Sequence, residues 1–512
     1  MLVVGRTSAV ALLAATPVLL CTTIAHAQTA AELAGRLRPG SDPAQQLQDQ
    51  LNQQDAEYRR RFFADTPIAD RILVDYGGSF RFGYNLVQDS QSRNQQMFQY
   101  DGRFYGRVEL DGFLRLYGRL RVQYNDWNTI GDYAPSDEGW QNPIGELYWA
   151  EFDFSNWLAS TDGQQRAWQL SVKGGRQYII WTTGLTLSDY MYAGELDARY
   201  DIWSFQGIVG VTAGHDTVDW DTSRPGYDTD TSRLYLGGRI TADLGSFSPY
   251  FFYLAQFDQN AGQTANLPPG VAPAFQAPTK FGYDSQYWGL GTNGTVGANW
   301  LYRAELVLET GSTWSDSIKH DPTIPPNLLA TPQHRVPVLA EAGIFGATWL
   351  ARDAADTRVD LQLVAGSGSV FRLDSGNTYG GILPGHTDTS FNSNGYVNTG
   401  LVFAPDPANI CAPSVTFSFS PFHSTETPGD MRVSVTAFLY LRWEADAPIS
   451  VPTQLGGSNL LGSEYDFNVD WRLWSDINFS FRYGIFVPNT GVFTDVESEP
   501  RQFLYSGVTY AF

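Results

Sequence analysis

Arg501-Gln-Phe-Leu-Tyr-Ser-Gly-Val-Thr-Tyr-Ala-Phe512 is the stretch on which the interpretation of the whole chain depends. Every second residue back from Phe512 forms one face, on which Tyr510, Val508 and Leu504 are apolar. The stretch is about as long as the ~9–11 residues that a tilted transmembrane strand needs. This pattern predicts a strand with one side in lipid. The alternative is the last strand of a soluble sandwich, and the rest of the chain distinguishes the two.

Alternation with a period of two recurs from Ile72 to the end of the sequence. Short connections alternate with long polar ones, as periplasmic turns and extracellular loops do in membrane barrels. A soluble β-helix or propeller would have a fixed repeat length, which this sequence lacks. Strands are expected over 72–88, 96–110, 113–126, 142–155, 166–178, 194–203, 205–214, 232–244, 247–258, 286–298, 300–313, 335–351, 357–370, 395–404, 413–423, 431–445, 463–474, 476–487 and 501–512.

These nineteen segments cannot all span the membrane, because a single-chain bacterial barrel needs an even number of strands. Counts from the two ends agree only if 395–404, 413–423 and 431–445 contain two spanning strands. We therefore predict an all-β fold, a transmembrane antiparallel β-barrel of about 18 strands over residues 72–512. The last strand resembles the closing strand of bacterial outer-membrane barrels, where a final Phe marks the assembly signal. The resemblance implies the outer-membrane lipid bilayer and the barrel assembly machinery as partners.

The N-terminal residues predict export. A positive charge at Arg6, an apolar run over 9–25 and the small residues of Ala25-His-Ala27 form a secretory signal over residues 1–27. Residues 28–71 form a separate periplasmic segment, either one short helix that starts at Asp42-Pro43 or a disordered tether. Cys411 is the only cysteine outside the signal, so no intrachain disulfide is expected. The predicted location is the bacterial outer membrane.

Charge and motifs exclude several functions. The net charge of −21 argues against nucleic acid as a partner. The six histidines fall in the signal, in loops or at strand ends, without a nucleophile motif or metal spacing. We therefore expect no enzyme activity, no catalytic site, no metal site and no cofactor. Acidic loops such as Asp228-Thr-Asp230 could bind calcium, and a solvated loop is the alternative interpretation.

The alternation also predicts which charges face the lumen, since an Arg at the bilayer midplane on the lipid side costs roughly 2–4 kcal/mol. A cluster of five arginines in 96–126 meets a single mid-strand acid, Glu109, which indicates unneutralised positive charge suited to an anion pathway. Pairing with carboxylates of other strands, which would only brace the wall, is the alternative. The inward arginines of the expected pathway include Arg103, Arg107, Arg115, Arg119, Arg121, Arg199, Arg239, Arg303 and Arg482.

One region carries a family resemblance. Gly145-Glu-Leu-Tyr-Trp-Ala-Glu-Phe-Asp-Phe154 followed by Leu170-Ser-Val-Lys-Gly-Gly-Arg-Gln177 resembles the early hairpin of the alginate export family of outer-membrane barrels. The resemblance implies an eighteen-stranded barrel that exports a polyuronate through an arginine-lined constriction. It adds Arg176 to the pathway by motif match. Here an extra glycine precedes Arg176, so a bulge at Gly174-Gly175 is expected to turn that side chain inward.

The sequence thus predicts an outer-membrane channel for export or diffusion of an anionic polysaccharide or oligosaccharide. One alternative is a structural or adhesive barrel that acts through its long extracellular loops. Another is a general porin for small anionic solutes. The lumen distinguishes them, because a purely structural barrel should have balanced and paired interior charge throughout.

Overall fold

The computed structural model describes residues 72–88, 93–129, 138–213, 221, 223–226, 232–260, 264–267, 277–320, 328–372, 378, 381–422, 429–451, 456–493 and 495–512. The expected signal, the N-terminal segment and Asp228–Asp230 lie outside these residues. The strands of the main sheet are β1 (Ile72–Gln88), β2 (Asn94–Leu110), β3 (Leu114–Thr129), β4 (Gly139–Asp153), β5 (Trp168–Trp181), β6 (Leu187–Tyr200), β7 (Trp203–Thr212), β8 (Arg233–Ala242), β9 (Phe247–Asp258), β12 (Tyr283–Val296), β13 (Trp300–Trp314), β16 (Arg335–Leu350), β17 (Arg358–Gly366), β18 (Ile410–Phe422), β19 (Met431–Leu441), β20 (Leu460–Arg472), β21 (Ile477–Pro488) and β22 (Arg501–Ala511).

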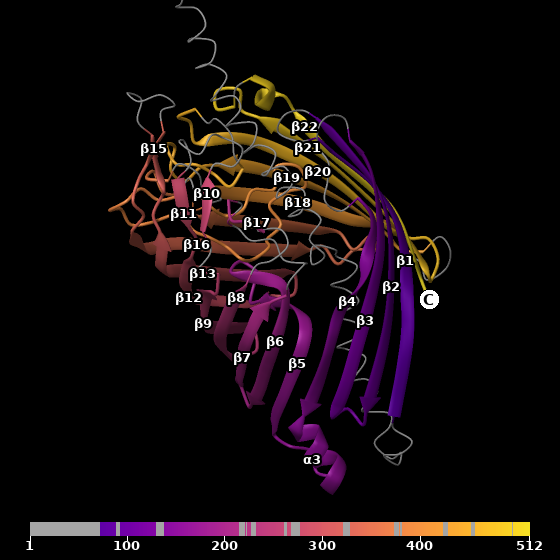
Figure 1. Cartoon of the computed structure of the whole chain (residues 1–512). Coiled ribbons are helices and arrows are strands. Elements are labelled where there is room, and N and C mark those ends of the chain that lie inside the picture. Colours follow the sequence, from indigo (N-terminus) through magenta and orange to yellow (C-terminus); the bar gives the residue numbers. More distant parts are fainter. Residues whose placement is uncertain are drawn as a thin grey trace, which may run out of the picture.

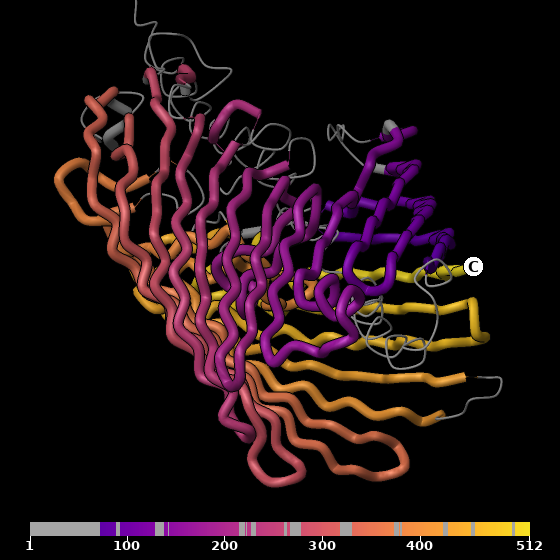
Figure 2. The backbone as a smooth tube through the Cα atoms, turned by 90° about the horizontal axis from the view of Figure 1, so that it is seen from below, coloured from indigo at the N-terminus to yellow at the C-terminus, as the bar shows by residue number. Residues whose placement is uncertain are grey.

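These strands form one closed, antiparallel, 18-stranded barrel. Each strand pairs with its neighbours in sequence, and β1 closes the cylinder by pairing with both β2 and β22. Figures 1 and 2 show the indigo first strand beside the yellow last strands. Closure leaves no free edge in the main sheet, which is how strands satisfy their backbone groups in lipid. The predicted fold and strand number are confirmed.

The uncertain region of the sequence contains two spanning strands, as the even-number argument required. The segments 413–423 and 431–445 correspond to β18 and β19. The segment 395–404 is not a strand, because its backbone is bound inside the barrel rather than to neighbouring strands. Alternation alone does not distinguish a lipid-facing strand from an apolar segment packed in the lumen.

Apolar side chains cover the outside of the barrel. They are exposed on successive strands, although alternate residues of the same strands are buried or polar. An exposed apolar belt around a closed barrel is stable in a bilayer and not in water. The chain is therefore an outer-membrane barrel. Its belt includes Val108, Leu116, Leu120, Leu196, Leu236, Leu290, Leu306, Leu339, Leu361 and Val435.

The two ends of the barrel differ. At one end the connections are short, as between β2 and β3, where Asp111 and Gly112 both have positive φ (43° and 71°) that an Asp-Gly pair tolerates. The same end carries α3 (Phe154–Asp162), capped at its start by the Asp153 side chain and visible at the bottom of Figure 1. At the other end lie the small hairpins β10 (Thr264–Leu267) with β11 (Ala277–Lys280) and β14 (Ile318–His320) with β15 (Leu328–Ala330), and the 3-10 helix η4 (Asp495–Ser498). None of the described helices is long and apolar enough to cross a bilayer.

Candidate functional site

The inner faces of β2 and β3 carry the predicted arginine cluster. Residues 103–107 and 115–119 both have the pattern Arg-x-Tyr-Gly-Arg, and the two strands pair without a register shift. On each strand a tyrosine therefore lies between two inward arginines, since alternate residues share a face. Arginines and carboxylates on either side of the tyrosines form two groups. We call the group towards the long connections the upper cluster and the other the lower cluster.

The upper cluster is built around two buried carboxylates. The Asp101 carboxylate lies 3.1 Å from guanidinium nitrogens of Arg81 and Arg103. Its other oxygen is 3.5 Å from Arg121 Nε. The second carboxylate, Glu146, lies 2.7 Å from Arg119 Nε and 3.3 Å from Arg103 Nε. In the part of the chain that the structure describes, these pairs join four arginines to two acids, so the six side chains carry a formal net charge of +2. The cluster consists of Arg81, Asp101, Arg103, Arg119, Arg121 and Glu146.

The lower cluster is closer to neutral. Arg107 pairs with Asp75 of β1 at 3.3 Å. Arg115 lies 3.2 Å from Glu151 of β4 and 3.8 Å from Glu109. Further along the wall Lys173 approaches Glu195 at 3.7 Å. The lower cluster consists of Asp75, Arg107, Glu109, Arg115, Glu151, Lys173 and Glu195.

These pairs overturn the expectation that Glu109 alone opposes the five arginines. Asp101 lies in the same hairpin, and Asp75 and Glu146 come from the strands on either side. Most of these arginines therefore pair with carboxylates of their own or neighbouring strands, as the alternative interpretation expected. Among these five arginines, the excess of positive charge over paired carboxylates is found in the upper cluster. The alternation of β2 could have revealed Asp101, which shares a strand face with Arg103. The sequence could not reveal Asp75 and Glu146, because their proximity follows from the register of four strands.

An aromatic row separates the two clusters. The Tyr105 and Tyr117 rings have centroids 6.1 Å apart with an angle of 18° between their planes. Tyr117 and Trp149 are 5.3 Å apart with an angle of 19°. Lys173 Nζ lies 4.9 Å from the centre of the Trp149 ring. All three rings are on the inner face and partly exposed. We call Tyr105, Tyr117 and Trp149 the aromatic row.

Arg176 is not part of the aromatic row, and it contacts the upper cluster through the backbone of Glu146. The register of β5 is unbroken through Gly175, so the expected bulge is absent. Gly175 instead has φ 139°, and a Cβ there would lie 2.3 Å from the Tyr148 carbonyl oxygen, so only glycine fits. The buried Arg176 donates from Nε to the Glu146 carbonyl oxygen (3.1 Å) and from a terminal nitrogen to the Tyr192 hydroxyl (3.3 Å). It therefore positions the β4 segment that carries Glu146.

The four remaining predicted arginines lie on other strands. Arg482 on β21 pairs with Asp470 at 2.7 Å. Arg303 on β13 is exposed and donates to the Gln362 side chain at 2.8 Å. Arg239 on β8 lies 6.0 Å from the centre of the Tyr250 ring. Arg199 on β6 is exposed near the short-turn end. The structure does not gather these four with the two clusters.

The described residues between β17 and β18, which are 367–372, 378 and 381–409, lie against the inner wall of the barrel, and we call them the lumenal segment. The Asn392 backbone N–H donates to Glu309 at 2.9 Å, and its carbonyl oxygen accepts from the Tyr287 hydroxyl at 2.7 Å. Further along, Glu464 accepts from the N–H groups of Leu401 and Val402 at 2.6 and 2.7 Å. Buried carboxylates that accept several N–H groups hold a segment without regular structure against the wall.

The lumenal segment reaches almost opposite strands of the barrel. The Asn394 N–H donates to the Thr186 carbonyl oxygen at 3.2 Å, at the inward-leaning tip between β5 and β6. The same segment binds Glu464 on β20, which is eight strands from β6 by the shorter way around the 18-stranded barrel and ten by the longer way. The described part of the long polar connection 371–394 therefore lies against the inner wall and not outside the barrel. Because the lumenal segment lies inside the barrel, it reduces the cross-section that is open to solutes.

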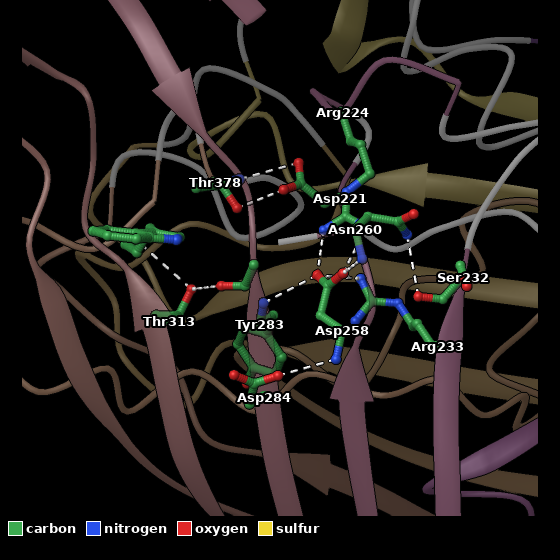
Figure 3. A network of polar contacts seen from close by, with 12 residues as sticks. Asp221, Arg224, Ser232, Arg233, Asp258, Asn260, Tyr283, Asp284, Thr313 and Thr378 are labelled. Carbon is green, nitrogen blue, oxygen red and sulfur yellow. Dashed lines mark hydrogen bonds and ion pairs between the residues drawn. The ribbon is translucent and has the colours of Figure 1, made fainter. Parts of the chain in front are cut away.

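The lumenal segment is also hydrogen-bonded at the end of the barrel that carries the long connections. Figure 3 shows these contacts. Thr378 donates from its N–H to Asp221 at 3.1 Å, and its hydroxyl reaches the same carboxylate. Beside Asp221, Arg224 donates to Asp258 at 3.2 Å, and Arg233 lies 3.8 Å from that carboxylate. Both arginines are buried, so their charge-assisted contacts with Asp258 join the described residues of the β7–β8 connection to the end of β9. The neighbouring Asp221 holds the N-terminal part of the lumenal segment through Thr378.

Comparisons with known proteins concern the arrangement of strands. No family model matches the chain, and no curated protein matches its sequence. The chain is similar to the crystal structure of Acinetobacter baumannii OccAB1, with 8% identity over 86% of this chain and 96% of that one, at a TM-score of 0.49. It is similar to Pseudomonas aeruginosa OccK8 (OprE), with 10% identity over 86% and 98% and a TM-score of 0.48. It is also similar to the high-pH structure of Pseudomonas putida OprB, with 9% identity over 87% and 95% and a TM-score of 0.41. With TM-scores below 0.5, the fold assignment rests on the strand pairings described above.

Proposed function

We propose that this outer-membrane barrel is a passive diffusion channel for small anionic solutes. The observation that carries the proposal is the upper cluster, where four arginines share two carboxylates on the inner wall. Excess positive charge in a narrow aqueous path raises the local concentration of anions. Ions in that path pass within about a Debye length, ~10 Å at 0.1 M salt, of the wall charges.

Small solutes are favoured over a polymer because the lumenal segment occupies part of the cross-section. Its contacts with Glu309 and Glu464 hold it by backbone hydrogen bonds. Export of an anionic polysaccharide or oligosaccharide, which the resemblance to the alginate export family implies, is the second candidate and requires this segment to move. A structural or adhesive barrel is the third, and the paired lower cluster is the observation that favours it.

Reversal potentials across planar bilayers in a KCl gradient test the proposal. Arg121→Gln removes one positive charge of the upper cluster and should lower the anion-to-cation permeability ratio. Asp101→Asn removes one negative charge there and should raise it. One charge about 6 Å from a passing ion in water contributes about 0.7 kcal/mol, with opposite sign for anions and cations, so each substitution should change their permeability ratio by up to about tenfold.

Arg166→Gln is the matched control, since Arg166 pairs with Asp162 beside α3, outside the lumen. Its permeability ratio should equal that of the unmodified protein. Equal ratios for all four proteins would show that the upper cluster does not select ions. A barrel without conductance would instead support the structural role.

A further inference from the structure

We propose that the aromatic row is a binding subsite for a sugar ring, so that the channel has affinity for saccharides independent of their charge. The inference rests on the proposed channel function. It concerns a separate wall feature, since Tyr105, Tyr117 and Trp149 lie between the two charged clusters. One face of a pyranose ring is covered by C–H groups, and its edge carries hydroxyls. The row and its neighbours offer a matching surface to both.

The rings are placed where a solute can reach them. Many of the described aromatic side chains face lipid or are packed into buried clusters within the lumen, such as the one around Phe403 and Tyr440. Tyr105 and Trp149 are partly exposed on the inner face and belong to neither group. An apolar surface left open to water in a polar lumen costs free energy unless something binds there.

The wall beside the row keeps the rings accessible and fixed. Glycines on the two flanking strands face the ends of the row. Gly77 of β1 lies opposite Tyr105, and Gly175 of β5 lies opposite Trp149. A Cβ at Gly77 would lie 3.1 Å from the Tyr105 ring, so this ring lies against the bare β1 backbone. Tyr117 packs against the buried cluster of Leu147, Tyr190 and Ala213. Side chains of β1 and β5 therefore do not cover the row at these positions, and its rings cannot easily turn away.

Groups that bind hydroxyls border the row. On the lower side, the Glu151 and Asp75 side chains are 19% and 33% exposed, so their carboxylates can accept from sugar hydroxyls. Arg115 and Lys173 beside them, 16% and 25% exposed, can donate. Aromatic contact with C–H groups between such donors and acceptors is chemistry that suits a sugar and not a simple inorganic anion. The near-neutral lower cluster needs no charge on the solute.

Saccharide block of single-channel current tests the inference. Maltotriose, a neutral probe, should reduce the conductance of the unmodified channel in a saturable manner, whereas a polyethylene glycol of equal size should not saturate. Trp149→Ala should raise the half-blocking maltotriose concentration roughly tenfold, which corresponds to about 1.4 kcal/mol. Tyr105→Leu keeps apolar volume without a ring, and it should also raise the half-blocking maltotriose concentration. Trp288→Ala, which removes a lipid-side tryptophan that is 42% exposed, is the control and should leave it unchanged.

Failure of this inference is distinguishable from failure of the proposed function. Neither ring variant changes a charge, so both should keep the reversal potential of the unmodified channel. If maltotriose does not block, or blocks the ring variants equally well, the row is a wall brace and the inference is overturned even where Arg121→Gln still shifts selectivity. A barrel that folds and passes no ions overturns both. Heat-modifiable migration on gels confirms folding of each variant before the current is measured.

Discussion

Phe512 closes the barrel against Gly78 through two backbone hydrogen bonds. The Gly78 N–H donates to the Phe512 carbonyl oxygen at 2.9 Å, and the Phe512 N–H donates back at 3.0 Å. The Phe512 ring is 54% exposed on the outer surface and stacks on Phe80 of β1 with centroids 5.7 Å apart. The last residue therefore joins the first and last strands at the seam, away from the lumen.

Deletion of Phe512 should reduce the yield of folded barrel without changing the pore. The deletion removes both seam hydrogen bonds, which contribute about 1–3 kcal/mol together, and the ring contact with Phe80. Heat-modifiable migration after refolding measures the yield, and single-channel conductance of the folded fraction reports the pore. Phe247→Ala is the control, because this outward aromatic (41% exposed) at the short-turn end of β9 lies far from the seam. Unimpaired folding of the deletion variant would contradict the inferred role of the final aromatic residue.

Alternation was sufficient to predict the barrel because lipid and lumen impose opposite demands on successive residues. Leu116 and Leu120 are exposed outward, whereas Arg115 and Arg119, each directly before one of these leucines, point inward, as the period of two requires. The same rule fails for residues 395–404. That stretch is apolar for a different reason, since Val402 and Phe403 pack in a buried cluster inside the lumen. A local pattern does not reveal which side of the wall a segment occupies.

Glu464→Gln should loosen the lumenal segment. The Glu464 carboxylate accepts from the N–H groups of Leu401, Val402 and Phe403, and an amide has only one acceptor oxygen to replace two. We expect larger or noisier single-channel conductance than in the unmodified protein. Glu444→Gln, an exposed position beyond the end of β19, is the matched control. Unchanged conductance and noise would mean that other contacts hold the segment without Glu464.

The stabilising contribution of Asp356 should be lost only in acid. Asp356 lies in the turn between β16 and β17, where the hydrogen bond from Arg358, followed by the charges of Arg358 and Arg432, holds its pKa below the ordinary 3.8. A lowered pKa in the folded state stabilises the fold above the unfolded-state pKa, and this contribution is lost as the pH falls through the folded-state value. The effect is small because the side chain is 43% exposed.

Urea unfolding of the unmodified protein and of Asp356→Asn measures this contribution. The two proteins should differ by the same small amount across about pH 5–8 and converge below about pH 4. Asp243→Asn is the control in another short turn, where the carboxylate accepts from the Gly245 N–H at 3.1 Å. A difference that instead varies between pH 5 and 8 would assign the titration to another group.

The inward direction of the arginines was predictable, and their charge balance was not. Asp75 and Glu146 reach the arginines of β2 and β3 from flanking strands, through a register that no single hairpin encodes. The motif match likewise indicated Arg176 but not its contact with the Glu146 carbonyl oxygen. Replacement of both Arg115 and Arg119 by Glu, a charge-reversal test of the predicted anion pathway, is therefore not neutral to folding. It would place a carboxylate at the buried Arg119 position beside Glu146.

A double-mutant cycle on Arg119 and Glu146 separates bracing from ion selection. The pair is buried, with Nε and the carboxylate 2.7 Å apart, so Arg119→Gln or Glu146→Gln alone leaves a buried charge poorly compensated. Each single variant should lose about 3–5 kcal/mol of unfolding free energy, and the double variant should recover about 1–3 kcal/mol relative to additivity.

Ion selectivity of the same variants should follow the net charge of the upper cluster instead. Arg119→Gln lowers the anion-to-cation ratio, Glu146→Gln raises it, and the double variant, with unchanged net charge, restores it. Additive stabilities would show that the pair does not brace the wall. Equal selectivity in the two single variants would show that the upper cluster, however well braced, does not act on passing ions.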